Sequence, residues 1–135
     1  MSEKKIITKY VKTDFDLLTN SDKTLVLKAK SMLKSAYAPY SGFLVGAAVH
    51  LENGEIITGN NQENVAYPSG MCAERVAIFY AKSQFPNTKI NSIAVSAISK
   101  NFLIEDVVSP CGSCRQVISE YEVKQNENIL SLIHI

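Results

Sequence analysis

The sequence lacks an apolar run that approaches the ~20 residues needed to cross a bilayer, so we expect no membrane-spanning segment and no membrane partner. It also lacks an excess of either charge, because 14 Lys and Arg oppose 13 Asp and Glu and leave a net charge of +1. Proteins that bind long nucleic acids usually carry a basic stripe, so this balance favours a small, neutral substrate. The lysines near the N-terminus are not followed by an apolar core, which predicts a cytoplasmic protein.

Cysteine is scarce, with three residues in a chain of 135, and an odd number cannot pair completely within one chain. In a reduced compartment such thiols serve as structural side chains, as a metal site or as a nucleophile. The remaining composition, 46% hydrophobic and 20% charged, is that of an ordinary globular protein. We therefore expect a single domain over residues 1–135 that buries its core without disulfides.

Helices and strands are expected to alternate after residue 40, which indicates an α/β protein. Asn53-Gly54 predicts a tight hairpin, and residues 59–70 are polar and rich in turn formers. Residues 1–20 are an N-terminal extension with a possible strand at 6–11. The expected helices are 21–35, 72–82 and 111–121, and the expected strands are 44–51, 55–58, 90–99 and 129–135.

Capping residues indicate where two of these helices begin. Asn20, Ser21 and Asp22 offer N-cap side chains for the first helix. Pro110 is expected in the first turn of the last helix, where proline is best tolerated. The final strand, 129–135, is apolar on both faces, so we expect both faces to be covered.

The three cysteines all lie at or beside expected helix starts. Cys111 and Cys114 are three residues apart, which puts both sulfurs on one side of a first helical turn. Helix N-termini favour negative charge, so two such starts facing each other would gather three thiolates around one point. Three protein ligands leave the fourth position of a tetrahedral zinc ion open, as in catalytic sites. We therefore predict that Cys72, Cys111 and Cys114 bind one zinc ion per chain.

Glu74 lies two residues after Cys72 in an otherwise apolar helix. Residues two apart do not normally face the same side of a helix, but both can flank a site that lies off its N-terminus. A carboxylate there can take a proton from water activated by the metal and return it to a leaving amine. We therefore predict that Glu74 is the catalytic proton shuttle.

Together these residues form a specific signature. Cys72-Ala73-Glu74 followed by Pro110-Cys111-Gly112-Ser113-Cys114 is the three-cysteine form of the pattern of zinc-dependent nucleobase deaminases. Over about residues 35–121 the chain resembles the small homotetrameric cytidine deaminases. The further blocks that carry this resemblance are Tyr37-Ala38-Pro39-Tyr40-Ser41-Gly42-Phe43, Val45-Gly46-Ala47-Ala48, Gly59-Asn60-Asn61-Gln62-Glu63-Asn64 and Ser109 to Val117.

The resemblance implies a three-layer α/β/α sandwich with a mixed sheet and one zinc ion as cofactor. It implies hydrolytic deamination of cytidine or deoxycytidine to the uridine product, with release of ammonia, as a step of pyrimidine salvage. The partner is then a small-molecule nucleoside and no long nucleic acid. The chain is expected to form a homo-oligomer, a tetramer as in the family or a dimer.

The resemblance also assigns roles to individual residues. Cys72, Cys111 and Cys114 match the zinc ligands, and Glu74 matches the proton shuttle. Arg75 matches a residue that hydrogen-bonds the thiolates and offsets their charge, since three thiolates and one zinc ion carry a net −1. The residues that match substrate-binding positions are Asn61 and Glu63 at the ribose 3′ hydroxyl, Phe43 near the base, Ala73, and Tyr67 at a site shared between subunits.

The chain departs from the resembled family at its C-terminal side. Relatives continue past the position of Ile135 with further sheet, a helix and an aromatic residue that stacks on the base bound by a neighbouring subunit. We therefore expect the family's last strand or strands and last helix to be missing here. The base pocket would then be open on that side.

Other functions are compatible with parts of this pattern. The same chemistry serves deamination of a cytosine-containing antibiotic such as blasticidin S, although the quoted motifs favour nucleosides. A non-catalytic, zinc-stabilised module would have no need of Glu74, and a redox role for Cys111 and Cys114 leaves a third cysteine and a glutamate unexplained. Taken singly, the cysteines are compatible with buried small hydrophobes, and Asn61 and Glu63 with solvated turn residues.

Overall fold

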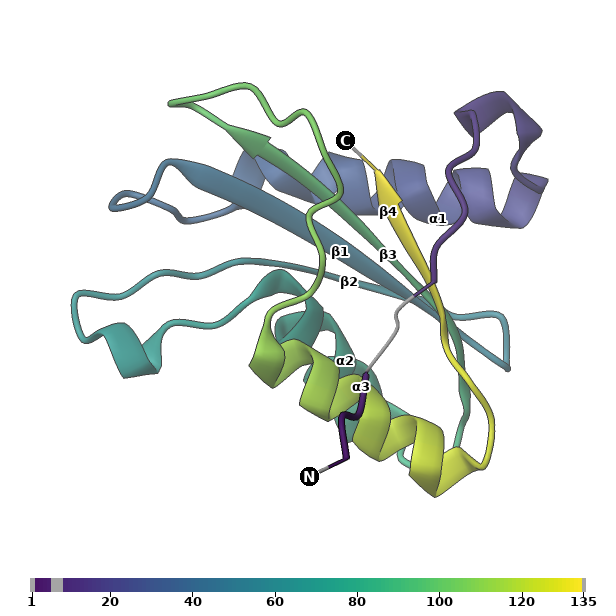
Figure 1. Cartoon of the computed structure of the whole chain (residues 1–135). Coiled ribbons are helices and arrows are strands. Elements are labelled where there is room, and N and C mark those ends of the chain that lie inside the picture. The colour runs from purple at the N-terminus through teal and green to yellow at the C-terminus, as the bar shows by residue number, and fades with distance from the viewer. Residues whose placement is uncertain (1, 6–8, 135) are drawn as a thin grey trace.

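The computed structural model describes residues 2–5 and 9–134, which form a mixed sheet with helices on both faces (Figure 1). The strands are β1 (Phe43–Leu51), β2 (Ile56–Asn60), β3 (Ile90–Ser99) and β4 (Leu130–His134). The α-helices are α1 (Asn20–Ser31), α2 (Ala73–Gln84) and α3 (Gly112–Gln125). Short 3₁₀ helices occupy Phe15–Leu17, Met32–Ser35 and Tyr67–Ser69.

The strands are arranged in the order β2-β1-β3-β4. β1 is antiparallel to β2 and to β3, whereas β4 runs parallel to β3 because α3 carries the chain back between them. The expected hairpin joins β1 to β2. Gly54 takes a positive φ of 88°, which glycine adopts without steric cost, and donates its N–H to Leu51 O at 2.9 Å.

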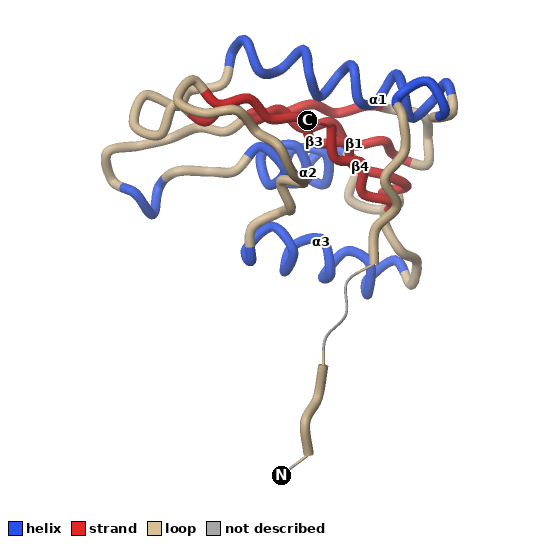
Figure 2. The backbone as a smooth tube through the Cα atoms, turned by 45° about the horizontal axis from the view of Figure 1, so that its top comes forward, coloured by secondary structure: helices blue, strands red, loops and turns tan. Residues whose placement is uncertain are grey.

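Alternate residues of β1 point to opposite faces of the sheet and divide the core into two parts. Ala47, Val49 and Leu51 belong to the larger cluster, which includes residues of α2 and α3, whereas Ala48 packs in the cluster beneath α1. Figure 2 shows α1 on one side of the sheet and α2 and α3 on the other. The prediction of a three-layer α/β/α sandwich with a mixed sheet is therefore confirmed.

A close contact joins the end of β2 to the beginning of α2. A Cβ atom at Gly59 would lie 2.7 Å from Ala77 N and 2.9 Å from Ala73 O, distances that no side chain tolerates. The glycine therefore lets the helix approach the strand directly. This approach fixes the N-terminal turn of α2 beside the end of β2, where Asn60 is the last residue and Asn61 follows.

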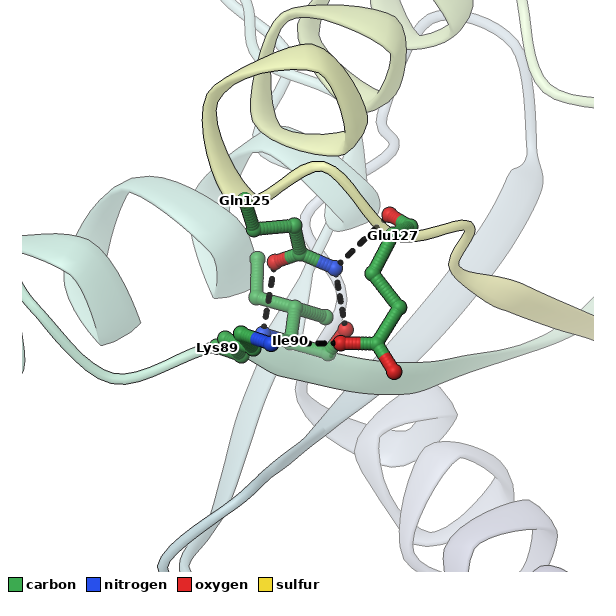
Figure 3. Close-up of polar contacts among 4 residues, drawn as sticks. All are labelled: Lys89, Ile90, Gln125 and Glu127. Atoms are coloured by element: carbon green, nitrogen blue, oxygen red, sulfur yellow. Dashed lines mark hydrogen bonds and ion pairs between the residues drawn. The ribbon is translucent and has the colours of Figure 1, made fainter.

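The C-terminal end of α3 is fastened to the start of β3 by side-chain contacts (Figure 3). Gln125 Oε1 accepts a hydrogen bond from Ile90 N at 3.0 Å, and its Nε2 donates to Ile90 O at 2.9 Å and to Glu127 O at 3.0 Å. Lys89 Nζ forms an ion pair with Glu127 at 2.8 Å. These contacts hold α3 against the sheet at the end opposite its N-terminal turn.

The helix boundaries differ in detail from those expected. Thr19 caps α1, because its backbone is extended and its Oγ1 accepts a hydrogen bond from Asp22 N at 3.1 Å. The end of the expected first helix tightens into the 3₁₀ turn Met32–Ser35. Pro110 precedes the cap of α3 rather than standing in its first turn, because Cys111 has extended backbone and occupies the cap position.

The two ends of the chain also differ from expectation. Residues 6–8 of the possible strand 6–11 lie outside the described residues. Residues 9–11 form no strand, because no strand of the sheet pairs with them. β4 is only partly covered: Leu130 is 53% exposed, whereas Leu132 packs against the cluster beneath α1. Ile135 lies outside the described residues. In the part of the chain that the structure describes, no helix has the length and apolarity to cross a bilayer.

Candidate metal centre and active site

Three sulfur atoms converge where α2 and α3 begin. Cys72 is the N-cap of α2, Cys111 is the N-cap of α3, and Cys114 lies one turn into α3. All three Sγ atoms lie within 4.8 Å of one another, and those of Cys72 and Cys111 are 3.7 Å apart. Cys111 Sγ also accepts a hydrogen bond from Cys114 N at 3.4 Å, as a capping side chain does. The fold thus brings together the thiols that the two helix starts led us to expect at one point.

A tetrahedral zinc ion fits this donor set. Sulfurs bound at ~2.3 Å to such an ion stand ~3.8 Å apart, close to the 3.7 Å between Cys72 and Cys111. Cys114 is buried, Cys72 is partly buried and Cys111 is exposed, so the cluster has a protected and an open side. Across residues 2–5 and 9–134, no other group of three potential ligands meets so closely, and neither histidine belongs to this one.

Arg75 contacts the cysteine cluster. Its Nη2 donates to Cys72 Sγ at 3.5 Å, and its Nε is buried without a hydrogen-bond partner in the described structure. A hydrogen bond from Cys114 and the guanidinium of Arg75 lower the pKa of the Cys72 thiol to about 5. The same Cys72–Cys114 hydrogen bond, together with burial and the charge of Glu74, raises the pKa of Cys114. The guanidinium of Arg75 is therefore in contact with one of the three thiols.

Glu74 lies in the first turn of α2 beside the thiols and is 6% exposed. It is the only charged side chain among the buried residues of the described chain. Burial is the main cause that raises the pKa of its carboxyl group, and the neighbouring Cys72 adds to the effect. Within the described part of the chain Glu74 has no salt-bridge partner, and an acid kept from water in this way costs stability. Its position suits a chemical role better than a structural one.

Asn61 and Glu63 are not solvated turn residues, because Asn61 holds the start of β1 and Glu63 holds the turn before it. Asn61 Oδ1 accepts a hydrogen bond from Val45 N at 2.9 Å, and its Nδ2 donates to Phe43 O at 2.8 Å. Glu63 Oε2 accepts from Tyr40 N at 2.9 Å, and its Oε1 accepts from the Ser41 hydroxyl. The hydrogen bond from Ser41 is the main cause that lowers the pKa of Glu63. Both side chains retain hydrogen-bonding capacity for a ligand.

The remaining expected substrate residues lie in different surroundings. Phe43 begins β1 and stacks on Phe102, with ring centroids 6.1 Å apart and planes 21° from parallel. Ala73 is fully buried as the first residue of α2. Tyr67 is 91% exposed in the 3₁₀ helix between β2 and α2. Within one chain, Phe43 lies at the start of β1 and Ala73 at the start of α2, whereas the Tyr67 ring is exposed to solvent.

The local sequence gives little indication that Ser41 or Phe102 lies beside the expected substrate residues. Ser41 connects Glu63 to Phe43, because its Oγ donates to the carboxylate and accepts from Phe43 N at 3.0 Å. The only signal for Ser41 is its place in a serine-glycine turn before an expected strand. Phe102 has no such signal, since its partner Phe43 is distant in the chain.

Comparison with known proteins agrees with this geometry. Residues 19–127 match the family model described as the cytidine and deoxycytidylate deaminase zinc-binding region. The chain is 45% identical over 97 residues to a cytidine deaminase of Sporosarcina psychrophila, covering 72% of this chain and 67% of the relative. It is 43% identical over 96 residues to a cytidine deaminase of Halalkalibacterium halodurans, covering 71% of this chain and 68% of that protein.

A solved structure shows the same fold. The cytidine deaminase from Burkholderia pseudomallei superposes with a TM-score of 0.64 at 36% identity, covering 77% of each chain. The family model spans both cysteine motifs, which are the residues that gather at the starts of α2 and α3. The cofactor of this centre is accordingly zinc. By its sequence, its fold and this convergence of thiols, the chain belongs to the cytidine and deoxycytidylate deaminase family.

Proposed function

We propose that the chain hydrolyses cytidine or deoxycytidine to the corresponding uridine nucleoside and ammonia. The observation that supports this most directly is the meeting of three thiols at two helix N-termini with a buried carboxyl group beside them. A purely structural metal site has no need of such an acid. The near-neutral net charge of +1 suits an uncharged nucleoside.

In this proposal the cysteines bind the metal and Arg75 offsets part of their charge. Cys72, Cys111 and Cys114 would hold zinc, which would supply Lewis-acid chemistry when bound. Arg75 balances part of the thiolate charge by its contact with Cys72. The two helix dipoles act in the same direction, because both helices direct their positive ends at the sulfurs.

Glu74 would carry the protons of the reaction. Hydrolysis places the oxygen of one water molecule on C4 of the base, one of its protons on the ring nitrogen and the other on the departing ammonia. A carboxylate beside the reacting atoms can accept a proton from the water and deliver it to these nitrogens. Burial of Glu74 keeps bulk water from competing for the transfer.

The residues around β1 would bind the nucleoside. Asn61 and Glu63 would add a hydrogen bond to the ribose hydroxyl while they keep their contacts with Phe43 O and Ser41. Phe43 would face the base, with Ala73 at the floor of the site. Tyr67, exposed in one chain, would meet the site of a neighbouring subunit in a homotetramer. We also propose a cytoplasmic role in pyrimidine salvage and a single domain over residues 1–135.

The proposal is tested by measuring zinc content and nucleoside turnover on the same preparation. We expect about one zinc ion per chain and a fall in ultraviolet absorbance as cytidine or deoxycytidine is consumed. Blasticidin S is assayed in parallel. If it were turned over faster than the nucleosides, the antibiotic would be assigned as the substrate instead. Full zinc content without turnover of any of the three would favour the non-catalytic module.

A further inference from the structure

The stacked pair Phe43 and Phe102 joins the start of β1 to the loop that follows β3. This loop, Lys100 to Ser109, ends beside the zinc ligand Cys111, and Figure 1 shows it running from β3 to the beginning of α3. Phe102 is 60% exposed, so burial in the core does not explain its position. Its neighbour Leu103 is 80% exposed.

Hydrogen bonds fasten the first residues of this loop to the turn before β1. Lys100 N donates to Gly42 O at 3.0 Å, and Asn101 Nδ2 donates to Ser41 O at 2.9 Å. A Cβ atom at Gly42, whose φ is +65°, would lie 2.9 Å from Asn101 Nδ2. The close fit therefore depends on glycine at this turn, and it places Phe102 opposite Phe43.

The pair lies on the same face of the sheet as the metal centre. Phe43 shares a face of β1 with Val45, which packs against the cluster that includes α2 and α3. A row of main-chain hydrogen bonds continues from there toward the zinc ligands. Asn61 N donates to Val45 O at 3.0 Å, and Gln62 exchanges two hydrogen bonds with Met71, the residue before Cys72.

We propose that Phe102 is a substrate-positioning residue that acts through Phe43. Its ring supports one side of the Phe43 ring and so holds Phe43 in the orientation in which it meets the pyrimidine base. This role rests on the proposed function, because it requires the base to lie against Phe43. Phe102 contributes to base binding and takes no part in the proton transfer at Glu74.

The test compares Phe102→Ala with Leu103→Ala, a matched change at the next residue of the same loop. We expect Phe102→Ala to raise the KM for cytidine about 3- to 10-fold with kcat unchanged, the range that an aromatic pair contributes. The dissociation constant of the product uridine, measured by calorimetry on the zinc-loaded protein, should rise by the same factor. Phe102→Tyr should restore both values, and Leu103→Ala should change neither.

Several results would overturn the inference. An unchanged KM and uridine affinity in Phe102→Ala, or an equal loss in Leu103→Ala, would remove the specific role of the ring. A changed oligomeric state of Phe102→Ala in sedimentation would assign the side chain to a contact between copies. If the unmodified protein neither binds nor deaminates pyrimidine nucleosides, the proposed function fails first and this inference fails with it.

Discussion

Gln125 pairs with Ile90 through both halves of its side-chain amide, as a neighbouring strand would. Oε1 accepts from Ile90 N and Nε2 donates to Ile90 O, at 3.0 and 2.9 Å. The side chain thereby satisfies main-chain groups at the very start of β3. It also ties the last turn of α3 to the sheet, which helps to hold that helix and its two cysteines in place.

Gln125→Ala should lower the free energy of unfolding by about 1–3 kcal/mol, because Ile90 loses both partners of its N–H and C=O groups. Urea unfolding followed by circular dichroism measures the change. Gln116→Ala, on an exposed position of the same helix, is the control and should be nearly neutral. Equal effects of the two substitutions would mean that the loss comes from the helix in general and not from the contact with Ile90.

Replacing any one of Cys72, Cys111 or Cys114 with alanine should reduce bound zinc from about one ion per chain to nearly none and lower the melting temperature. Two remaining thiols no longer complete the site. Metal analysis after gel filtration measures the bound zinc, and a thermal melt measures the melting temperature. Ser113→Ala, within the same turn of α3, should keep both values. Full zinc occupancy in all three cysteine variants would contradict the assignment.

Glu74→Gln should keep zinc and fold while kcat for cytidine falls by about 10²–10⁴-fold. The amide has nearly the same shape as the acid but cannot accept and return a proton. Turnover is measured by ultraviolet absorbance, and zinc analysis on the same sample is the control. Near-normal turnover in this variant would make Glu74 a structural residue.

Asn61→Ala should raise the KM for cytidine and also destabilise the chain by about 1–3 kcal/mol, because Val45 N and Phe43 O lose their partner. The hydrogen bonds that Asn61 makes with β1 account for the cost in stability. Steady-state kinetics and urea unfolding separate the two effects. A stable protein with an unchanged KM would show that Asn61 is an ordinary solvated loop residue.

Glu63 should make stability depend on pH on the acid side. Its pKa is lowered in the folded chain, mainly by the hydrogen bond from Ser41, relative to about 4.3 in an unfolded chain. The unfolded state therefore binds more protons in this range, so the contribution is present above about pH 4.3 and is lost as the pH falls through the folded value. Glu63→Gln should flatten the fall in melting temperature between about pH 5 and pH 3. Glu55→Gln, at an exposed residue of the β1–β2 turn, should leave that fall intact.

Local signals were enough to find α2, α3 and the cysteines that begin them. Cys72 and Cys111 lie at positions where an apolar helical pattern starts, and the spacing of Cys111 and Cys114 brings both sulfurs to one side of a turn. The hairpin at Asn53-Gly54 was predictable for the same reason, since two neighbouring residues define its geometry. Chemistry that depends on residues near one another in the chain can be recognised from the sequence.

The sequence by itself therefore determined which three cysteines meet, the acid beside them and the alternation of helices and strands. Only the tertiary structure decided which side chains support them. Ser41 and Glu63 are 22 residues apart, and Gln125 and Ile90 are 35 apart, yet each pair is joined directly. Phe102 meets Phe43 only because β1 and β3 are neighbours in the sheet. Such contacts depend on strand register and on how closely a helix approaches a sheet, and no local pattern of residues specifies either.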